Sequence, residues 1–421
     1  MTENIKSSRV SGFYRLPIEK RIEFVKKFSD LTDEETKLFS SCLNIDIADR
    51  MIENVLGTFE LPLGVAVNFV INGRDYLVPM AIEESSVVAA ASNAAKIARV
   101  KGGFTAECSP PLMIGQIQVL KVEDVTEASQ SIIEHKPEIL RLANAQDKIL
   151  VELGGGAKDL EVRILDSPLG KMIVIHLIVD VRDAMGANAV NTMCEALAPE
   201  IEELTGGKTR LRILSNLADK RIVKAKAVFD KNTMGGENVV DAFLESYTLA
   251  SIDPYRAATH NKGIMNGVDA LIIATGNDFR AIEAGAHAYA ARKGRYTSLT
   301  TYYKNKDGDL VGEIELPMAV GVVGGAANMH PKARLCRKIL GVKTAEELAM
   351  VAGSLGLAQN FAAVFALSTV GIQKGHMSLH AKNIAVMAGA KGEEIDQVAD
   401  QMVKEGKIRL DRAKEILEEI R

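Results

Sequence analysis

Tryptophan is absent from this chain of 421 residues, and aromatic residues make up only 5% of it. The interior must therefore be built mainly from aliphatic and alanine side chains, which the 47% of hydrophobic residues can supply. An excess of charge of one sign is also lacking, because the net charge is only −4. That balance does not favour binding to nucleic acid or to an acidic membrane surface. Length and composition predict a globular protein of more than one domain.

The cysteines are few and far apart. Cys42, Cys108, Cys194 and Cys336 form no C-x-x-C pair. Structural zinc sites need closely spaced thiolates or imidazoles, so we expect no metal site and four reduced thiols. No apolar run approaches the roughly 20 residues that span a bilayer, and the N-terminal residues do not resemble a signal peptide. We therefore expect a cytoplasmic protein with no membrane partner.

The order of apolar and polar segments predicts a mixed α/β fold with an inserted domain. Thr32, with Glu35 three residues later, predicts a capping box at the start of a helix. Asn72-Gly73 joins two alternating segments and predicts a hairpin, and the alanine-rich run 85–99 predicts a buried helix. From about residue 110, strands and helices alternate as one compact unit. Within it we expect strands at 113–121, 158–165, 172–181 and 210–214, and helices at 127–145 and 188–204. A short strand is expected at Leu271–Ala274, and the chain from 344 onward is expected to be almost entirely helical.

Glu83 and Glu84 directly precede the alanine-rich helix. Carboxylates at a helix N-terminus commonly lie at the surface and complement the helix dipole. Alternatively, one of them points into a cleft, where removal from water would let it hold a proton at neutral pH. The residues alone leave both interpretations open.

The segment Asp183–Asn188 joins an aliphatic strand to a helix. A helix N-terminus that follows a turn of small residues can bind an anion, because its backbone N–H groups point outward. A tight turn without a ligand is the alternative. The pattern is not G-x-G-x-x-G, so a Rossmann fingerprint is absent. Gly207-Lys208-Thr209 mimics the end of a P-loop, but Glu202 stands where its first glycine is needed, which excludes ATP binding.

A dense polar segment runs from Asp253 to Gly267. Its polar side chains include Arg256, His260, Asn261, Lys262 and Asn266. Such a concentration favours a function over a solvated connection. Asp278 follows the apolar run 271–274, which places a carboxylate at the end of a predicted strand. A lysine that faces a carboxylate in a closed pocket can stabilise a developing alkoxide.

His376 and His380 are four residues apart and share a helix face, which is also the spacing of two zinc ligands. Met377 stands where the H-E-x-x-H pattern requires glutamate, so a metalloprotease is excluded. One histidine on a mobile helical appendage could close over a ligand and act as a general acid. Two ordinary interfacial histidines are the alternative.

Together and in this order, these segments closely resemble the soluble, class II 3-hydroxy-3-methylglutaryl-CoA reductases. The likeness covers nearly the whole chain and rests on residues 51–62, 83–92, 183–188, 255–263, 275–278 and 375–377. The family interconverts hydroxymethylglutaryl-CoA and mevalonate plus CoA by two hydride transfers, through a mevaldyl-CoA hemithioacetal and mevaldehyde. Which direction the cell uses stays open.

By this resemblance, four residues fall on the family's catalytic positions, namely Glu84, Lys262, Asp278 and His376. The resemblance implies that Lys262 stabilises the oxyanion and that Asp278 holds the lysine. Glu84 would supply the proton for aldehyde reduction, and His376 would protonate the departing CoA thiolate. A non-catalytic relative would be expected to have lost at least one of the four.

The resemblance also assigns binding residues. Positions expected to hold the hydroxymethylglutaryl group are Ser86, Arg256, Asn266 and Asn216. The pyrophosphate of the nicotinamide dinucleotide is expected at Asp183, Met185, Gly186, Ala187 and Asn188. Asp147 aligns with a position that contacts the adenosine ribose. A carboxylate there accepts hydrogen bonds from both ribose hydroxyls and repels a 2′-phosphate, which favours NADH over NADPH.

The architecture implied by the resemblance has three parts. Residues 1–109 and 216–372 would form a large domain for CoA, substrate and dimerisation. Residues 110–215 would form a small, ferredoxin-like, non-Rossmann domain for NAD, and residues 373–421 a helical flap. An obligate homodimer is implied, with assemblies of dimers left open. The alternative is a CoA-thioester hydrolase or transferase on the same scaffold, which would not need the second, dinucleotide site.

Two departures from the family pattern occur. Ser85 stands where the family has proline, and serine at a helix start should preserve the geometry. The segment Lys224–Gly236 is shorter than in relatives, and we expect it at the surface.

Overall fold

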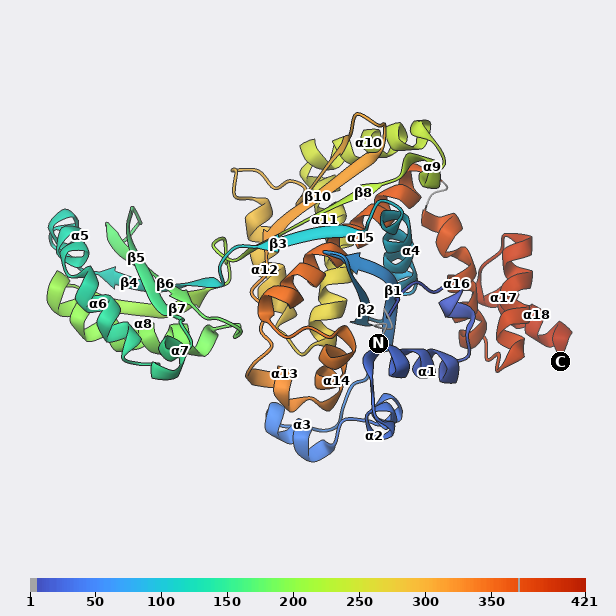
Figure 1. Ribbon diagram of the computed structural model, residues 1–421, viewed down its shortest axis with the longest axis horizontal. Helices are drawn as coiled ribbons and strands as arrows, with labels where there is room; N and C mark the ends of the chain where they lie inside the picture. The colour runs from blue at the N-terminus through green and yellow to red at the C-terminus, as the bar shows by residue number, and fades with distance from the viewer. Residues whose placement is uncertain (1–5, 370–371) are drawn as a thin grey trace, which may run out of the picture.

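The computed structural model describes residues 6–369 and 372–421, without the side chains of residues 326 and 372–379. The fold is a mixed α/β arrangement built around two separate sheets (Figure 1). This confirms the fold class expected from the sequence.

The larger sheet has six strands in the order β2-β1-β3-β8-β10-β9. They are β1 (Leu63–Ile71), β2 (Arg74–Ala81), β3 (Phe104–Cys108), β8 (Ile222–Phe229), β9 (Thr300–Lys304) and β10 (Leu310–Pro317). β1 pairs with β3 in parallel, and the other neighbours are antiparallel. The predicted hairpin is confirmed: Ile71 pairs with Arg74, and Asn72 and Gly73 have φ of 49° and 78°, as a type I′ turn requires.

Long helices cover one face of this sheet (Figure 1). They are α4 (Val87–Arg99), α10 (Glu237–Ile252), α11 (Pro254–Ala274), α12 (Phe279–Ala290) and α15 (Ala345–Ser368). Small residues let them approach closely. A Cβ at Gly356 of α15 would lie 3.0 Å from Ile264 and Val268 of α11, and one at Gly353 would lie 2.9 Å from Val223 of β8.

Helix α15 corrects the expectation that no apolar run is long enough for a membrane. With 24 residues and a mean hydropathy of 1.5 over its most apolar window, it passes that test by length and composition. However, 78% of that window is buried inside the protein. Leu355 and Phe361 are fully buried, and the polar Asn360 bonds to His260 and Tyr302. The helix is therefore a core element, packed on all sides.

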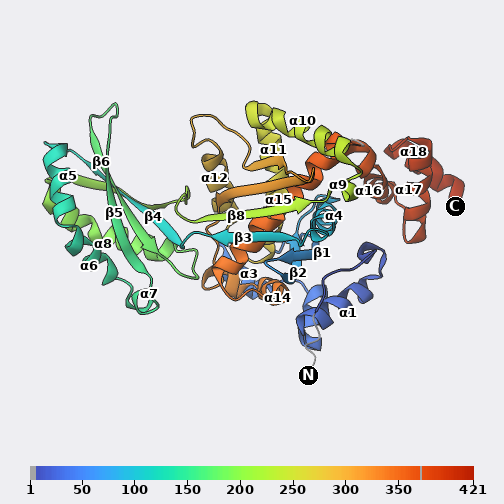
Figure 2. The same ribbon diagram turned by 45° about the horizontal axis from the view of Figure 1, so that its top comes forward.

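The smaller sheet has four antiparallel strands in the order β5-β6-β4-β7. We call residues 112–215 the small unit. It contains β4 (Leu112–Leu120), α5 (Val125–Glu134), α6 (Lys136–Asn144), α7 (Lys148–Glu152), β5 (Gly156–Leu165), β6 (Met172–Asp180), α8 (Ala187–Thr205) and β7 (Lys208–Ser215). This β-α-β-β-α-β order is ferredoxin-like and not Rossmann-like, as expected. Figure 2 shows the small unit beside the large sheet.

The single helix predicted at 127–145 is instead two helices, α5 and α6, which meet at His135. Pro137 lies in the first turn of α6. Proline has no N–H to continue the hydrogen-bond ladder of the preceding helix, so the ladder is interrupted there.

The two ends of the chain are helical. The N-terminal part contains η1 (Phe13–Arg15), α1 (Ile18–Ser29), α2 (Asp33–Lys37), η2 (Leu38–Ser40) and α3 (Ile45–Met51). The predicted capping box between Thr32 and Glu35 is present at the start of α2. The C-terminal part contains α16 (Ile372–Met387), α17 (Glu393–Glu405) and α18 (Leu410–Ile420), which bury a core of their own around Val398, Met402 and Leu417. The remaining short helices are α9 (Lys231–Met234), α13 (Gly325–Met329) and α14 (Pro331–Leu340).

Two sequence predictions for the large sheet and its helices are wrong. Leu271–Ala274 is not a strand but the last turn of the 21-residue helix α11. Four apolar residues do not distinguish a strand from a helix that is buried on several sides. The expected surface location of 224–236 is wrong for residues 224–229, which belong to β8 in the interior of the sheet, whereas Asn232, Thr233 and Gly235 are exposed. Ala225, Ala227 and Phe229 are buried in β8, and the alternating lysines face outward.

Candidate active site

A short contact links the first two candidate catalytic residues. Lys262 Nζ lies 2.9 Å from Glu84 Oε2, and Asn266 Nδ2 lies 3.5 Å from the same oxygen. Lys262 and Asn266 are four residues apart on α11 and therefore share a helix face. Glu84 lies between β2 and α4, which pack against α11. In the single chain the side chains of Glu84 and Lys262 are 40% and 59% exposed, so the cleft that would remove Glu84 from water is not closed.

Ser86 lies beside this contact with an unusual backbone. Its φ of 74° is left-handed, and it occupies the N-cap of α4 without a side-chain capping bond. Its hydroxyl oxygen is buried and has no hydrogen-bond partner in the described chain. Strain and an unsatisfied polar group together are typical of a ligand-binding position. Ser85, which replaces the family's proline, precedes the N-cap and is not itself the capping residue.

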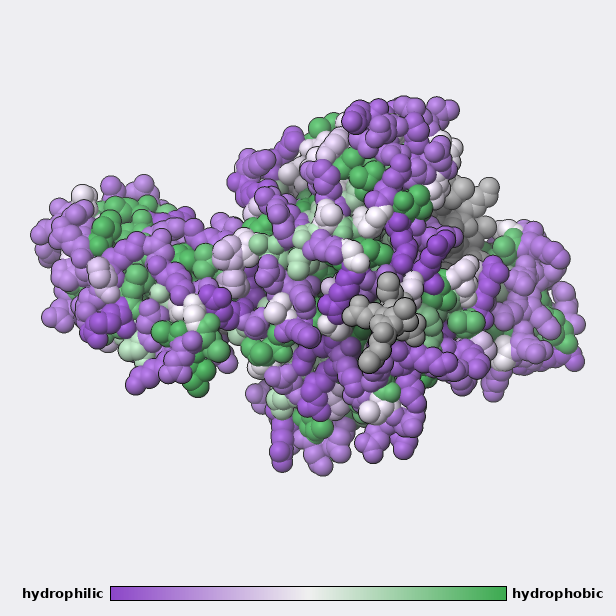
Figure 3. All heavy atoms as spheres, in the orientation of Figure 1, coloured by the Kyte–Doolittle hydropathy of each residue, from purple (hydrophilic) through white to green (hydrophobic). Residues whose placement is uncertain are grey.

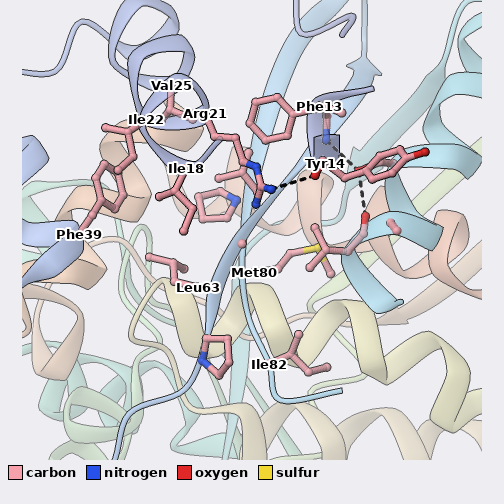
Figure 4. Close-up of a pocket in the computed structure, with 18 of the residues that line it drawn as sticks. Phe13, Tyr14, Ile18, Arg21, Ile22, Val25, Phe39, Leu63, Met80 and Ile82 are labelled. Carbon is pink, nitrogen blue, oxygen red and sulfur yellow. Dashed lines mark hydrogen bonds between the residues drawn. The ribbon is translucent and has the colours of Figure 1, made fainter. Parts of the chain in front are cut away.

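A pocket of about 1180 Å³ opens next to these residues. Glu84 and Ser86 line one part of it. Apolar side chains of the N-terminal helices and of the first hairpin line the rest, among them Phe13, Ile18, Ile22, Phe39 and Met80 (Figure 4). Its cationic lining residues are Arg21, Lys96 and Lys332. Sequence reasoning did not find this pocket, because its walls come from segments that are far apart in the chain.

Asp278 does not join the Glu84–Lys262 contact within one chain. It is the N-cap of α12, where it accepts hydrogen bonds from the backbone N–H of Arg280 and Ala281 and pairs with the Arg280 guanidinium at 3.0 Å. Twelve residues of α11 separate Lys262 from the end of the helix at Ala274, a rise of roughly 18 Å. The middle of α11 and its C-terminal end therefore carry different parts of the candidate site.

The turn Asp183–Asn188 lies near the Asp278 end. Gly186 has a φ of 99°, and a Cβ there would lie 2.5 Å from Val181, so the turn requires glycine. The N-cap of α8 makes no side-chain capping bond, which leaves N–H groups free for an anion. Asp183 also anchors the turn to the part of the chain that contains the larger sheet. Its Oδ1 accepts a hydrogen bond from Ala345 N, and its carbonyl oxygen accepts one from Val322 N.

Three further candidates have local roles in the single chain. Asp147 is the N-cap of α7, and its Oδ1 accepts the N–H of Leu150 at 2.9 Å. Asn216 lies against α12, where a Cβ at Gly285 would come within 2.5 Å of its carbonyl oxygen. Arg256 is half-buried on α11, and this burial lowers the pKa of its guanidinium. Arg256 does not share the face of Lys262, since they are six residues apart.

The histidines separate into different environments. His260, counted with the dense polar segment, is a core residue: its Nε2 lies 2.6 Å from Thr300 Oγ1, and burial lowers its pKa to about 3. His380 is exposed on α16. His376 also falls on α16, but its side chain lies outside the described residues.

Sequence reasoning missed a pair of carboxyl groups between α11 and α12. Burial and the neighbouring Glu283 raise the pKa of Asp269 to about 8. Glu283 also contacts His287 Nε2 at 3.1 Å, and the other ring nitrogen of His287 lies 2.7 Å from the Tyr296 hydroxyl. Asp269 follows Lys262 by seven residues and lies on the same side of α11. In the sequence, only this seven-residue spacing from Lys262 could have indicated Asp269.

The chain matches known proteins over almost its entire length. The family model for hydroxymethylglutaryl-coenzyme A reductase matches residues 17–381. A 3-hydroxy-3-methylglutaryl-coenzyme A reductase of Archaeoglobus fulgidus is 62% identical over 99% of this chain and 95% of its own length. A probable reductase of the same name from Borreliella burgdorferi is 36% identical over 92% of this chain and 89% of its own.

The solved structures lead to the same family. The class II enzyme of Streptococcus pneumoniae, bound to NADPH in open conformations, superposes with a TM-score of 0.82 at 41% identity. The match covers 96% of this chain and 100% of that one. The chain therefore belongs to the hydroxymethylglutaryl-coenzyme A reductase family, which confirms the resemblance drawn from its sequence and the nicotinamide-dependent reductase function that it implies.

Proposed function

We propose that this chain interconverts 3-hydroxy-3-methylglutaryl-CoA and mevalonate plus CoA as an obligate homodimer that prefers NADH. The observation that supports this most strongly is the Lys262–Glu84 contact, made near the middle of α11. Asp278 and the turn 183–188 lie at the C-terminal end of this helix. A two-fold axis would set the middle of α11 against the C-terminal end of the partner's helix. Each complete site would then use both subunits.

Exposed apolar residues support a contact surface of this kind. Ile52, Leu56 and Phe59 follow α3, and all three side chains are exposed in the single chain. Figure 3 shows small hydrophobic areas among hydrophilic residues near α3, at its lower edge. Large apolar side chains that remain exposed together in one short segment are typical of interaction sites. Residues 51–62 therefore belong to the proposed dimer interface.

The catalytic roles follow from the charges. The bound dinucleotide supplies the hydride for each reduction. The ammonium of Lys262 stabilises the negative charge that develops on the thioester oxygen, and Asp278 of the partner subunit holds that ammonium in place. Glu84, hydrogen-bonded to Lys262, delivers the proton to the alkoxide formed when mevaldehyde is reduced. His376 protonates the sulfur as the C–S bond to CoA breaks.

The pocket beside Glu84 fits the rest of the substrate. The free hydroxyl of Ser86, together with Arg256, Asn266 and Asn216, would hold the hydroxymethylglutaryl group. The apolar wall would take the pantetheine arm, and Lys96 and Lys332 would attract the phosphates of CoA. Arg21 is less available, because its guanidinium already donates to the carbonyls of Tyr14 and Leu16.

The dinucleotide would bind the small unit. Its pyrophosphate would lie at Met185, Gly186, Ala187 and Asn188, with Asp183 anchoring the turn. Asp147 would accept hydrogen bonds from the adenosine ribose. Its Oδ2 makes no hydrogen bond within the described residues, so it remains available although Oδ1 caps α7. A carboxylate at this position supports a preference for NADH, which must be measured, since the Streptococcus pneumoniae relative binds NADPH.

In this proposal, residues 1–109 and 216–372 bind CoA and the substrate and form the dimer contact. Residues 110–215 bind the dinucleotide. Residues 373–421 would act as a flap that brings His376 to the thioester and excludes water. We propose that the dimer works in the cytoplasm without a membrane partner.

The test is to mix the purified chain with hydroxymethylglutaryl-CoA and to follow both the oxidation of NADH and the release of CoA thiol. Oxidation of two NADH for each CoA released supports the proposal. Thiol release without oxidation of NADH or NADPH would support the hydrolase instead and would contradict the proposed reaction.

A further inference from the structure

Arg221 is a buried cation that no carboxylate of the described residues contacts within ion-pair distance, although Asp180 and Asp183 attract it from farther away. It lies directly before β8 and is only 5% exposed. Its guanidinium donates instead to three backbone carbonyls, those of Ala184 at 3.0 Å, Met185 at 3.3 Å and Val320 at 2.6 Å. Burial lowers the pKa of Arg221 to about 10, so it stays charged at neutral pH. A buried charge bound only to carbonyls is costly, which suggests a role.

The two carbonyls of the small unit belong to the turn that is proposed to hold the pyrophosphate. In a trans peptide, the C=O and the following N–H point in opposite directions, and no described peptide bond is cis. When Arg221 draws the carbonyls of Ala184 and Met185 inward, the N–H groups of Met185 and Gly186 must point away from it. Neither N–H donates a hydrogen bond to a described residue.

The charge of Arg221 favours an anion at the same place as the outward N–H groups do. Outward N–H groups, a left-handed Gly186 and the N-terminus of α8 together form an anion-binding concavity. A full positive charge behind the turn increases the attraction for an anion in front of it, and more so in a buried position where water screens little. The charge of Arg221 therefore adds to the attraction of the N–H groups for an anion. Arg221 cannot itself touch a ligand that is held on the outer side of the turn.

The same turn is locked to the segment that carries Asp278. Gly321 packs directly on it, because a Cβ there would lie 2.6 Å from Met185 N. The N–H of Gly321 donates to Asn277 Oδ1 at 2.8 Å, next to Asp278 in the chain. Arg221 joins both sides, since its third acceptor, Val320, precedes Gly321.

We infer that Arg221 is a positioning residue for the dinucleotide: it presets the N–H groups of the turn 183–188 toward the pyrophosphate and fixes the turn against the Asp278 segment. This inference rests on the proposed function, which places the pyrophosphate at this turn. No group of the substrate needs to contact Arg221.

The experiment measures dinucleotide and substrate binding in Arg221→Met and Arg221→Lys. Met keeps the length of the side chain without its charge or donors, and Lys keeps the charge but cannot reach three carbonyls with a fixed planar fork. We expect the KM for the dinucleotide and the Kd of ADP-ribose to rise at least tenfold in Arg221→Met. Arg221→Lys should be intermediate, and the KM for hydroxymethylglutaryl-CoA should change less than twofold in both.

Two more variants separate positioning from general destabilisation. Gly321→Ala places a Cβ 2.6 Å from Met185 N and 3.0 Å from Ala184 C, so it displaces the backbone of the turn without touching the charge, and should also weaken ADP-ribose binding. Arg99→Met removes a half-buried arginine that bonds to Asp75 and Ser8, far from the turn, and should lower Tm while leaving ADP-ribose binding unchanged.

The outcomes are distinguishable. Equal increases in both KM values, or a lower Tm with wild-type ADP-ribose binding, would overturn the inference and leave Arg221 as a purely structural residue. If the wild-type chain binds neither ADP-ribose nor NADH, the proposed dinucleotide site itself fails. If Arg221→Met does not fold, Arg221→Lys still decides the question.

Discussion

Lys262 and Glu84 are 178 positions apart in the sequence, yet the ammonium of one lies 2.9 Å from the carboxylate of the other. The contact forms because α11 packs against β2 and α4, whose connection carries Glu84. Both side chains remain partly exposed, so the charge pair is open on one side. An open ion pair beside a pocket is suited to receive a carbonyl oxygen, on which negative charge then develops.

The first prediction concerns the lysine of this pair. Lys262→Ala should lower kcat for the reduction of hydroxymethylglutaryl-CoA by roughly a thousandfold, because the developing oxyanion loses its cation. Binding of CoA, followed by calorimetry, should change little. Lys306→Ala, which removes an exposed lysine between β9 and β10, is the matched control. Turnover within a few-fold of the wild type in Lys262→Ala would contradict the proposed oxyanion role.

The second prediction concerns the choice of dinucleotide. Asp147→Ser removes the charge that would repel a 2′-phosphate but keeps a side chain that can cap α7. The KM for NADPH should fall and that for NADH should rise, with the ratio of the two shifting by about tenfold, equivalent to about 1.4 kcal/mol. Steady-state kinetics with each dinucleotide check this. An unchanged ratio would mean that Asp147 serves only as the cap of α7.

The third prediction concerns the pH dependence of stability. The pKa of Asp269 is raised from 3.8 to about 8 by burial and by Glu283. Between these values the folded state holds a proton that the unfolded state releases, so the stability should fall as the pH rises from about 4 to about 8. Asp269→Asn imitates the protonated carboxyl and should flatten this decline.

Thermal unfolding at a series of pH values from 5 to 9 would test it. The variant should gain Tm relative to the wild type as the pH rises. Asp307→Asn, at an exposed position between β9 and β10, should follow the wild-type curve. Parallel curves for Asp269→Asn and the wild type would show that the pair does not share a proton.

Local patterns in the sequence predicted several elements correctly. The Asn72-Gly73 hairpin, the Thr32–Glu35 capping box and the β-α-β-β-α-β order of the small unit depend on neighbouring residues, and all are present. The strand β8 was overlooked although Lys224 and Lys226 alternate with buried alanines. Its place in the sheet is set by pairing with β3 and β10, which are distant in the chain.

The candidate site shows the same limit. Motifs indicated which residues belong to it, but not that Lys262 contacts Glu84 while Asp278 is held elsewhere by Arg280. Lys262 and Asp278 are kept apart because α11 continues to Ala274. The prediction of a strand at Leu271–Ala274 made this helix too short, so the separation could not be seen from the sequence. Arg221 gave no signal at all, because a lone arginine becomes informative only when its three carbonyl partners are known.

The central claim is that each site combines Lys262 of one subunit with Asp278 of its partner, and a heterodimer tests it most directly. Lys262→Ala and Asp278→Ala chains would be co-expressed with different tags, and the doubly tagged dimer would be isolated and assayed for NADH oxidation. Each variant homodimer should be inactive. The heterodimer should have about half of the wild-type kcat, because one of its sites contains both intact residues. A heterodimer as inactive as the two homodimers, or a wild-type chain that is active as a monomer, would contradict the account.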